Sequence, residues 1–129
     1  TDIYTKVSMQ VDLGNYDFSY NPEIVVINVG TNDGSNPSAT DQQRMLTTVR
    51  QKNPNATIIW AYGMINHTAL NQIKTVVENF AKTDKNTYFV TLPQSNDGTD
   101  NWHTGPAGHA AAAKVLSEYI ANLKGWELK

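Results

Sequence analysis

The chain has 129 residues, 40% of them hydrophobic and 17% charged, which fits one globular domain with a core of its own. A formal net charge of -2 offers no basic surface for nucleic acid, and no apolar stretch is long enough to span a membrane. Because the chain has no cysteine, a disulfide framework and thiolate zinc sites are excluded, and His, Asp and Glu do not cluster at metal-ligand spacing.

Three short apolar runs predict the β-strands. Residues 24–29, 57–61 and 87–92 are near-continuous apolar stretches rich in β-branched and aromatic side chains. Runs of this kind, with no polar alternation, are typical of strands covered on both faces in a parallel sheet.

A first helical pattern follows the first of these runs. Residues 41–52 place Met45 and Leu46 on one face of a helix. Thr40 with Gln43 resembles a capping box, so we expect this helix to begin immediately after Thr40.

Two more helices are predicted further along the chain. Residues 70–80 keep the helical period of apolar side chains. The last helix opens at Pro106, a favoured first-turn residue, and Gly125 suits its C-terminal cap. Its expected apolar face consists of Val115, Leu116, Tyr119, Ile120 and Leu123.

The alternation of strands and helices predicts an α/β fold with a parallel sheet and right-handed crossovers. Residues 24–29 form the most apolar of the three runs, so we expect them to be the central strand of a doubly wound sheet. Residues 1–20 offer no strong strand to lie beside them. We therefore expect the first strands of the domain to lie upstream of Thr1, so that residues 1–129 are its C-terminal portion.

Polar loops leave the carboxyl end of each predicted strand. They read "GTNDGSN", "YGMINH" and "PQSNDGTDNWH", and they hold much of the glycine, asparagine and aspartate of the chain. Because ligands bind outside the carboxyl ends of the strands in open parallel sheets, we expect the chemistry at this edge.

The "DNWH" segment offers an acid–base pair. A carboxylate such as Asp100 can accept the Nδ1 proton of His103 and leave Nε2 as a base toward a nucleophile. On spacing alone, an incidental histidine beside a loop carboxylate is the better explanation, because a D-x-x-H match is common.

The "GTND" segment offers an oxyanion donor. Gly30 lets the chain turn as it leaves the strand, and the Asn32 amide can donate to a negative oxygen. We expect the Asp33 carboxylate to bond N–H groups of the loop and hold Asn32 in place. Asn-Asp-Gly is also ordinary turn chemistry, so this segment alone leaves the alternative open.

Taken together, "VVINVGTND" and, two strand–helix units later, "DNWHTGPAGH" resemble the SGNH (GDSL-like) hydrolase superfamily. Within it the chain is similar to the carbohydrate esterase family 2 acetylesterases, as the segment "YDFSYNPEIVVINVGTNDGS" and an aromatic beside the histidine indicate. The resemblance implies a flavodoxin-like three-layer parallel sheet. It also implies that Asn32, Asp100 and His103 are catalytic and that Trp102, Gly30 and Asp33 belong to the substrate site. Trp102 is either a sugar-stacking platform or a loop anchor.

The nucleophile of that superfamily is missing from this sequence. Its members take a serine from a Gly-Asp-Ser block after their first strand, and no such block occurs here. The resemblance therefore implies that the serine lies in an N-terminal segment of the same domain, and that the 129-residue chain alone is inactive. Members of carbohydrate esterase family 2 also show D-x-H more often than D-x-x-H.

The resemblance implies a serine ester hydrolase that removes acetyl groups from plant-polysaccharide sugars. Its partners would be an acetylated polysaccharide or oligosaccharide and the N-terminal segment with the serine. No metal or organic cofactor, nucleic acid or membrane is implied, and the substrate points to a secreted or cell-surface bacterial protein. The alternatives are a catalytically inactive glycan-binding relative, an SGNH lipase or thioesterase, or a flavodoxin-like fragment with coincidental motifs.

Overall fold

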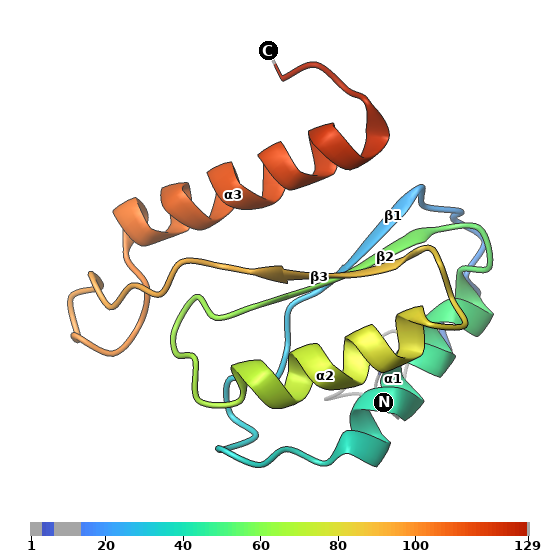
Figure 1. The fold of residues 1–129 in the computed structure, drawn as a ribbon, viewed down its shortest axis with the longest axis horizontal. Coiled ribbons are helices and arrows are strands. Elements are labelled where there is room, and N and C mark those ends of the chain that lie inside the picture. Colours follow the sequence, from blue (N-terminus) through green and yellow to red (C-terminus); the bar gives the residue numbers. More distant parts are fainter. Residues whose placement is uncertain (1–3, 7–13, 129) are drawn as a thin grey trace.

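A parallel sheet of three strands, in the order β1-β2-β3, forms the middle layer of the fold. The structure, a computed structural model, describes residues 4–6 and 14–128. The strands are β1 (Ile24–Ile27), β2 (Thr57–Tyr62) and β3 (Thr87–Thr91), and the helices are α1 (Ala39–Lys52), α2 (Leu70–Ala81) and α3 (Pro106–Lys124). Helices α1 and α2 cover one face of the sheet and α3 the other, as Figure 1 shows.

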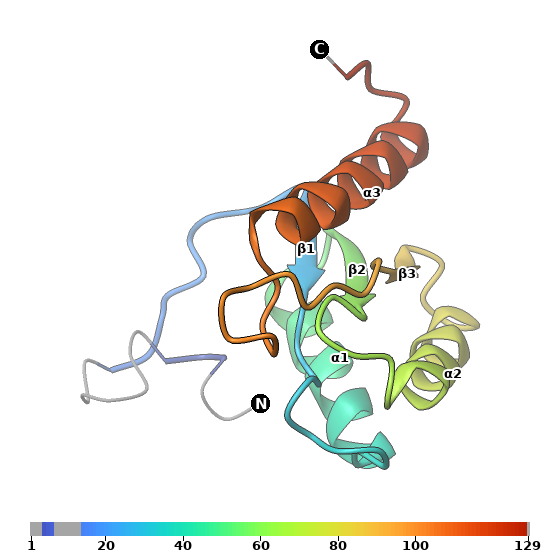
Figure 2. The ribbon, with the colours of Figure 1, turned by 90° about the vertical axis from the view of Figure 1, so that its left-hand side faces the viewer.

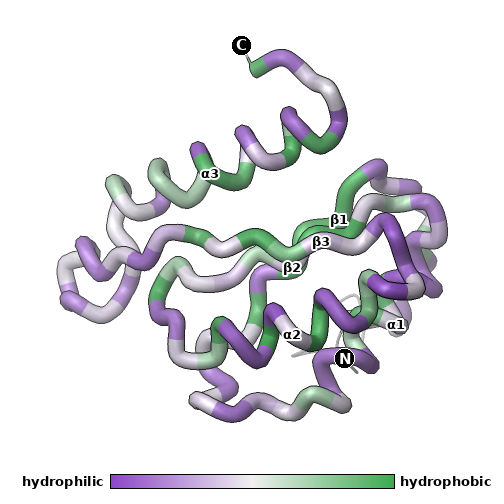
Figure 3. The backbone as a smooth tube through the Cα atoms, in the orientation of Figure 1, coloured by the Kyte–Doolittle hydropathy of each residue, from purple (hydrophilic) through white to green (hydrophobic). Residues whose placement is uncertain are grey.

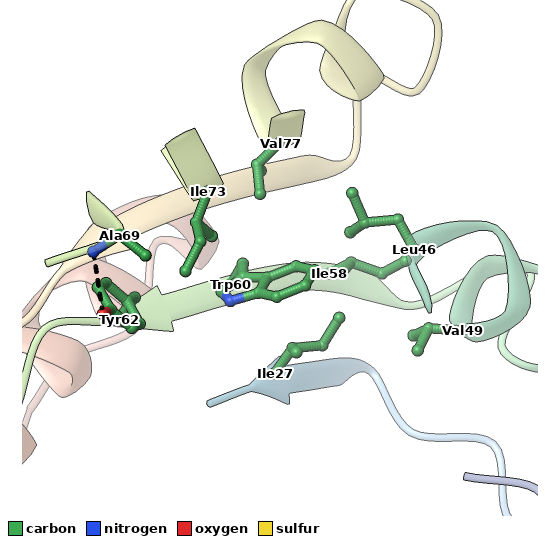
Figure 4. Packing of buried hydrophobic residues seen from close by; sticks show 9 residues of the cluster. All are labelled: Ile27, Leu46, Val49, Ile58, Trp60, Tyr62, Ala69, Ile73 and Val77. Atoms are coloured by element: carbon green, nitrogen blue, oxygen red, sulfur yellow. Dashed lines mark hydrogen bonds between the residues drawn. The ribbon is translucent and has the colours of Figure 1, made fainter. Parts of the chain in front are cut away.

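The main core lies between the sheet and the pair α1 and α2. Trp60 of β2 lies in its middle, with Ile73 and Val77 of α2 on one side and Ile27 of β1 on the other (Figure 4). Tyr62 is 1% exposed, and its hydroxyl accepts a hydrogen bond from the Ala69 N–H at the start of α2. Burying side chains of this size supplies most of the free energy that holds such layers together.

The second core lies between the sheet and α3. Ile59 and Ala61 of β2 lie beside Val90 of β3 on this face of the sheet and pack with Ala112 of α3. All six residues of β2 are buried, whereas Val26 of β1 is 41% exposed. Strand β2 is therefore the central strand of the described sheet, and β1 is an edge strand. In Figure 3 the strands form the hydrophobic centre, and the loop of residues 93–105 is mostly hydrophilic.

Within the described sheet, residues 24–27 thus lie at an edge, and the expectation that residues 24–29 are the central strand of a larger sheet stays a prediction. Strand β1 ends at Ile27, and on its far side no described residue forms a paired strand. Val26 and Val29, at 41% and 46% exposure, are apolar side chains left uncovered along this edge. The apolar run is there, but the neighbours that would bury it are not among these residues.

Two details of the helices also differ from the prediction. Helix α1 begins at Ala39, because the Ser38 hydroxyl accepts a hydrogen bond from the Asp41 N–H at 3.2 Å. Ser38 is thus the N-cap, and Thr40 lies within the first turn. Val115 is 36% exposed, while Leu116 packs into the core, so the apolar face of α3 is narrower than expected.

An ion pair fixes the amino ends of β2 and β3. The Arg50 guanidinium contacts the Asp84 carboxylate through Nε at 2.6 Å and through Nη2 at 3.2 Å. Partial burial acts to raise the pKa of Asp84, but hydrogen bonds from Arg50 and from the Asn86 N–H outweigh it and lower that pKa.

No helix in the described part of the chain is both long and apolar enough to cross a bilayer.

Candidate active site

The three polar loops leave the same end of the sheet, as the topology predicts. In Figure 1 the chain leaves β2 and β3 at their left-hand ends, and Figure 2 views the molecule from that side. The loop of residues 93–105 and the turn that follows β1 both face the viewer there. This edge therefore displays "GTND" and "DNWH" together.

Asp100 and His103 form a direct pair. The His103 Nδ1 lies 2.5 Å from Asp100 Oδ2. A carboxylate at neutral pH is only an acceptor, so Nδ1 carries the proton and Nε2 is left as the basic nitrogen. The side chains are 72% and 50% exposed, which leaves Nε2 open to an incoming hydroxyl.

Three donors converge on the Asp100 carboxylate. Besides the His103 ring, the N–H groups of Trp102 and His103 each donate to Oδ1 at 2.9 Å. These hydrogen bonds, the one from the His103 ring first, hold the pKa of Asp100 well below its ordinary value of 3.8. The carboxylate is therefore charged at neutral pH and can stabilise an imidazolium on His103.

The backbone of this loop closes on itself. The Gly98 N–H donates to the His103 carbonyl at 2.9 Å, and the Asn101 N–H donates to the Gly98 carbonyl at 3.1 Å. Asn101 has a φ of 58°, a left-handed conformation that asparagine tolerates better than most residues. Because the turn is closed by its own backbone, the pair is set in place before any substrate arrives.

A different construction follows β1. Gly30 has a φ of 115°, and a Cβ there would lie 2.8 Å from Ile73 Cδ1. Only glycine meets both demands without strain. The Asp33 N–H donates to the Gly30 carbonyl at 3.2 Å, and Trp60 Nε1 donates to the Val29 carbonyl at 3.3 Å. The turn that carries Asn32 is thus held by backbone and core contacts.

The side chains of Asn32 and Asp33 extend into solvent from this turn. Both residues are exposed, and neither side chain makes a hydrogen bond to any other described residue. The contacts expected between the Asp33 carboxylate and loop N–H groups are therefore not seen, because backbone hydrogen bonding closes the turn. No described contact joins Asn32 to Asp100 or His103. The Asn32 amide is left available as a donor.

Trp102 is 77% exposed beside His103. Its ring makes no aromatic or cation–π contact with the other described residues. The loop-anchor interpretation would require a buried ring, so this exposure favours a platform for a ligand.

A pocket of about 840 Å³ lies elsewhere, beside the end of β1 and the first turns of α1. Val29, Asp33 and Trp60 are among its lining residues, whereas Asp100 and His103 are not. Since the acid–base pair does not reach it, we do not assign substrate to this pocket.

Among the described residues, no group of three His, Asp or Glu side chains is arranged to hold a metal ion.

None of the described serines is hydrogen-bonded to His103. Ser38 caps α1, the Ser95 hydroxyl donates to the Asp97 carboxylate, and the Ser117 hydroxyl donates to the Lys114 carbonyl. Ser8 lies outside the described residues. Among the residues that the structure describes, the acid–base pair thus has no serine bonded to it.

Sequence reasoning did not single out Asp97. Its carboxylate accepts hydrogen bonds from the N–H groups of Gly105, Ala107 and Gly108 at the start of α3. The sequence carries one signal for such a residue. Gly105, just before Pro106, has no polar side chain that could cap the helix, so the first N–H groups of the helix need a hydrogen-bond acceptor from elsewhere in the chain.

Known proteins resemble this chain over most of its length. The family model for GDSL-like lipase/acylhydrolase matches residues 3–116. The cellulase/esterase CelE of Acetivibrio thermocellus is 34% identical over 127 residues, which cover 86% of this chain and 16% of CelE.

Two solved structures share the fold. An acetyl xylan esterase (Est2A) from the rumen bacterium Butyrivibrio proteoclasticus has a TM-score of 0.75 and 27% identity over 91% of this chain and 41% of that one. A family two carbohydrate esterase from Clostridium thermocellum, solved in complex with cellohexaose, has a TM-score of 0.75 and 33% identity over 88% and 40%. The expected SGNH hydrolase fold is confirmed, and the chain spans less than half the length of these relatives.

Proposed function

This chain belongs to the GDSL-like lipase/acylhydrolase family, and from that premise we propose that it is the C-terminal part of a serine esterase that deacetylates plant-polysaccharide sugars. The observation that supports this most directly is the hydrogen bond between Asp100 Oδ2 and His103 Nδ1 at the carboxyl end of the sheet. Relatives of the chain are esterases, so the reaction class is ester hydrolysis.

The mechanism follows from the pair and from the turn after β1. His103 Nε2 takes the proton of a serine as its hydroxyl attacks the ester carbonyl, and later passes it to the leaving sugar hydroxyl. Asp100 keeps Nδ1 protonated and stabilises the imidazolium that forms between the two steps. Asn32 donates its amide N–H to the oxyanion of the tetrahedral intermediate.

We propose that the serine comes from a segment of the full-length protein that packs beside β1. The exposed Val26 and Val29 form an apolar edge next to the turn with Asn32. A strand paired there would cover these side chains, and its carboxyl end would lie at the edge of the sheet that holds His103. The greater length of the solved relatives supports such a segment.

For the substrate we propose an acetylated plant oligosaccharide or polysaccharide, with Trp102 as a stacking surface for one sugar ring. The exposed indole next to the base supports this, since the face of a sugar ring packs well on an aromatic ring. Two relatives point the same way: one is described as an acetyl xylan esterase, and the other was solved with cellohexaose. A polymeric plant substrate would require the enzyme to act at the surface of a bacterial cell or outside it.

The absence of a described serine beside His103 favours a second candidate, a glycan-binding relative that has lost its nucleophile. Release of acetate from acetylated xylo-oligosaccharides by the full-length protein separates the two. We expect release from short acetyl esters, little from long-chain acyl esters, and none with residues 1–129 alone. Binding of the oligosaccharide without release of acetate would contradict the esterase, and preference for long acyl chains would point to a lipase.

A further inference from the structure

The first turn of α3 is capped by a side chain from outside the helix. The Asp97 carboxylate accepts hydrogen bonds from the N–H groups of Gly105 at 2.9 Å, Ala107 at 3.1 Å and Gly108 at 3.2 Å. Pro106 has no N–H, and the His109 N–H already donates to the Gly105 carbonyl. One carboxylate thus satisfies every N–H group that the start of this helix leaves without a helical partner.

Asp97 and Gly105 also form the neck of the loop that carries the acid–base pair. A Cβ on Gly105 would lie 2.5 Å from the Asp97 carbonyl oxygen, so the backbone at Gly105 approaches the backbone at Asp97 as closely as glycine permits. Residues 98–104, including Asp100 and His103, lie between them. The position of this neck therefore sets where the whole loop leaves the body of the protein.

The neck is tied to the loop after β2 as well. The Ser95 hydroxyl donates to Asp97 Oδ1, and the Ser95 N–H donates to the Met64 carbonyl at 2.9 Å. The Thr104 hydroxyl lies 3.2 Å from the same Met64 carbonyl and 3.1 Å from the Ser95 carbonyl. Asp97 is thus the acceptor at the centre of contacts that join β3, α3 and the loop between β2 and α2.

The charge of Asp97 suits this place. Hydrogen bonds from the Ser95 hydroxyl and then from the Gly105 N–H lower its pKa to about 2, so the carboxylate is ionised at neutral pH. A negative charge at a helix N-terminus also interacts favourably with the helix dipole. A neutral side chain of the same shape would lose both effects.

We propose that Asp97 is a positioning residue for catalysis: it anchors the loop of residues 98–104 to the start of α3 and so fixes His103 relative to the serine. It does not touch the substrate, and it acts through the neck and through the Asp100–His103 pair. The catalytic part of this proposal rests on the esterase function proposed above, whereas the anchoring of the pair does not.

Asp97→Asn in the full-length protein tests the proposal. The amide keeps the shape but turns one acceptor into a donor that faces backbone N–H groups, and it removes the charge. We expect kcat for an acetyl ester to fall by about a hundredfold, as for a displaced catalytic group, with a much smaller change in KM. The downfield proton resonance of His103 Nδ1–H should also shift or broaden, because the pair is no longer held in one geometry.

Asp17→Asn is the matched control. Asp17 also accepts hydrogen bonds from the N–H and hydroxyl of a nearby serine, Ser19, both at 3.0 Å, but it lies far along the chain from the pair. A folded Asp97→Asn protein whose kcat and His103 resonance match those of the Asp17→Asn protein would overturn the proposal. A role in stability alone predicts a lower melting temperature with both readouts unchanged.

Two further readouts keep the test decisive. If Asp97→Asn does not fold, Ser95→Ala removes one donor and leaves the backbone donors in place, and a smaller change in the same resonance is expected. An unchanged resonance in a folded Ser95→Ala protein would then count against Asp97. If the wild-type protein hydrolyses no ester, the esterase proposal fails, and the resonance still decides whether Asp97 holds the pair.

Discussion

The loop with Asp100 and His103 is held by carboxylates as well as by its own backbone, whereas the turn with Asn32 is held by backbone geometry and core contacts without a carboxylate. In the first, Asp97 and Asp100 each collect several N–H groups, and the acid–base pair is already formed. In the second, Gly30 bends the chain, and the amide of Asn32 has no partner among the described residues. The two groups differ in their partners: the base is already bonded to its acid in the free protein, whereas an oxyanion donor gains its partner only when the tetrahedral intermediate forms.

The largest expected effect is at His103. In the full-length protein, His103→Ala should lower kcat for an acetyl ester on the order of 10⁴- to 10⁶-fold, because no other group takes the serine proton. His109→Ala is the control, since His109 is an exposed histidine on α3. Steady-state kinetics measures both variants. A His103→Ala enzyme within tenfold of the wild type would remove the pair from the mechanism.

The turn after β1 should show the next largest effect. Asn32→Ala is expected to lower kcat on the order of a hundred- to a thousandfold and to leave KM nearly unchanged, because the lost hydrogen bond forms only in the transition state. Asn36→Ala changes another exposed asparagine of the same loop and should leave kcat unchanged. Equal kinetics for the two variants would show that Asn32 is an ordinary turn residue.

The same turn predicts a stability difference between two glycines. Gly30→Ala forces a left-handed φ on a side chain and a Cβ into Ile73, so the free energy of unfolding should drop by about 2–4 kcal/mol. Gly34 also has a positive φ, of 74°, but no atom lies within 4 Å of an added Cβ. Gly34→Ala should therefore cost only about 1 kcal/mol in a denaturant titration. Equal losses would mean that the contact with Ile73 adds nothing.

The smallest expected effect is a pH dependence of stability at the carboxylate-held loop. The pKa of Asp97 is lowered from 3.8 to about 2 in the folded protein, so ionised Asp97 stabilises the fold above pH 3.8. That contribution is lost as the pH falls toward 2. The melting temperature of Asp97→Asn should thus lie below that of the wild type at pH 7, and the gap should narrow between pH 4 and pH 2. A gap independent of pH would argue against a charged role.

The strands were predictable because each is a single apolar run. Residues 57–61 and 87–92 were placed within one residue of β2 and β3 at each end, since hydrophobic burial alone marks such strands. Pro106 and Gly125 marked the ends of α3 because each has a backbone preference that suits only that position. The "GTND" and "DNWH" segments could be assigned to one edge because parallel strands end on the same side of a sheet, whatever side chains they carry.

What escaped the sequence depends on tertiary contacts. Ser38 and Thr40 are both plausible caps, and only the path of the chain after Pro37 decides between them. The exposure of Val26 follows from which strands lie next to β1, a fact that no local pattern contains. Asp97 lies eight residues before Gly105, outside the range of local capping motifs, and Gly105 before Pro106 indicates only that the helix needs an acceptor from elsewhere.

The proposed mechanism is tested most directly by labelling the full-length protein with a serine-directed phosphonate and locating the modified residue by mass spectrometry. A single serine outside residues 1–129 should be labelled, and His103→Ala should abolish the labelling in a protein that still folds. Labelling of a serine within this chain, or none in a folded wild-type protein, would contradict the claim that His103 and Asp100 activate a serine supplied by the rest of the domain.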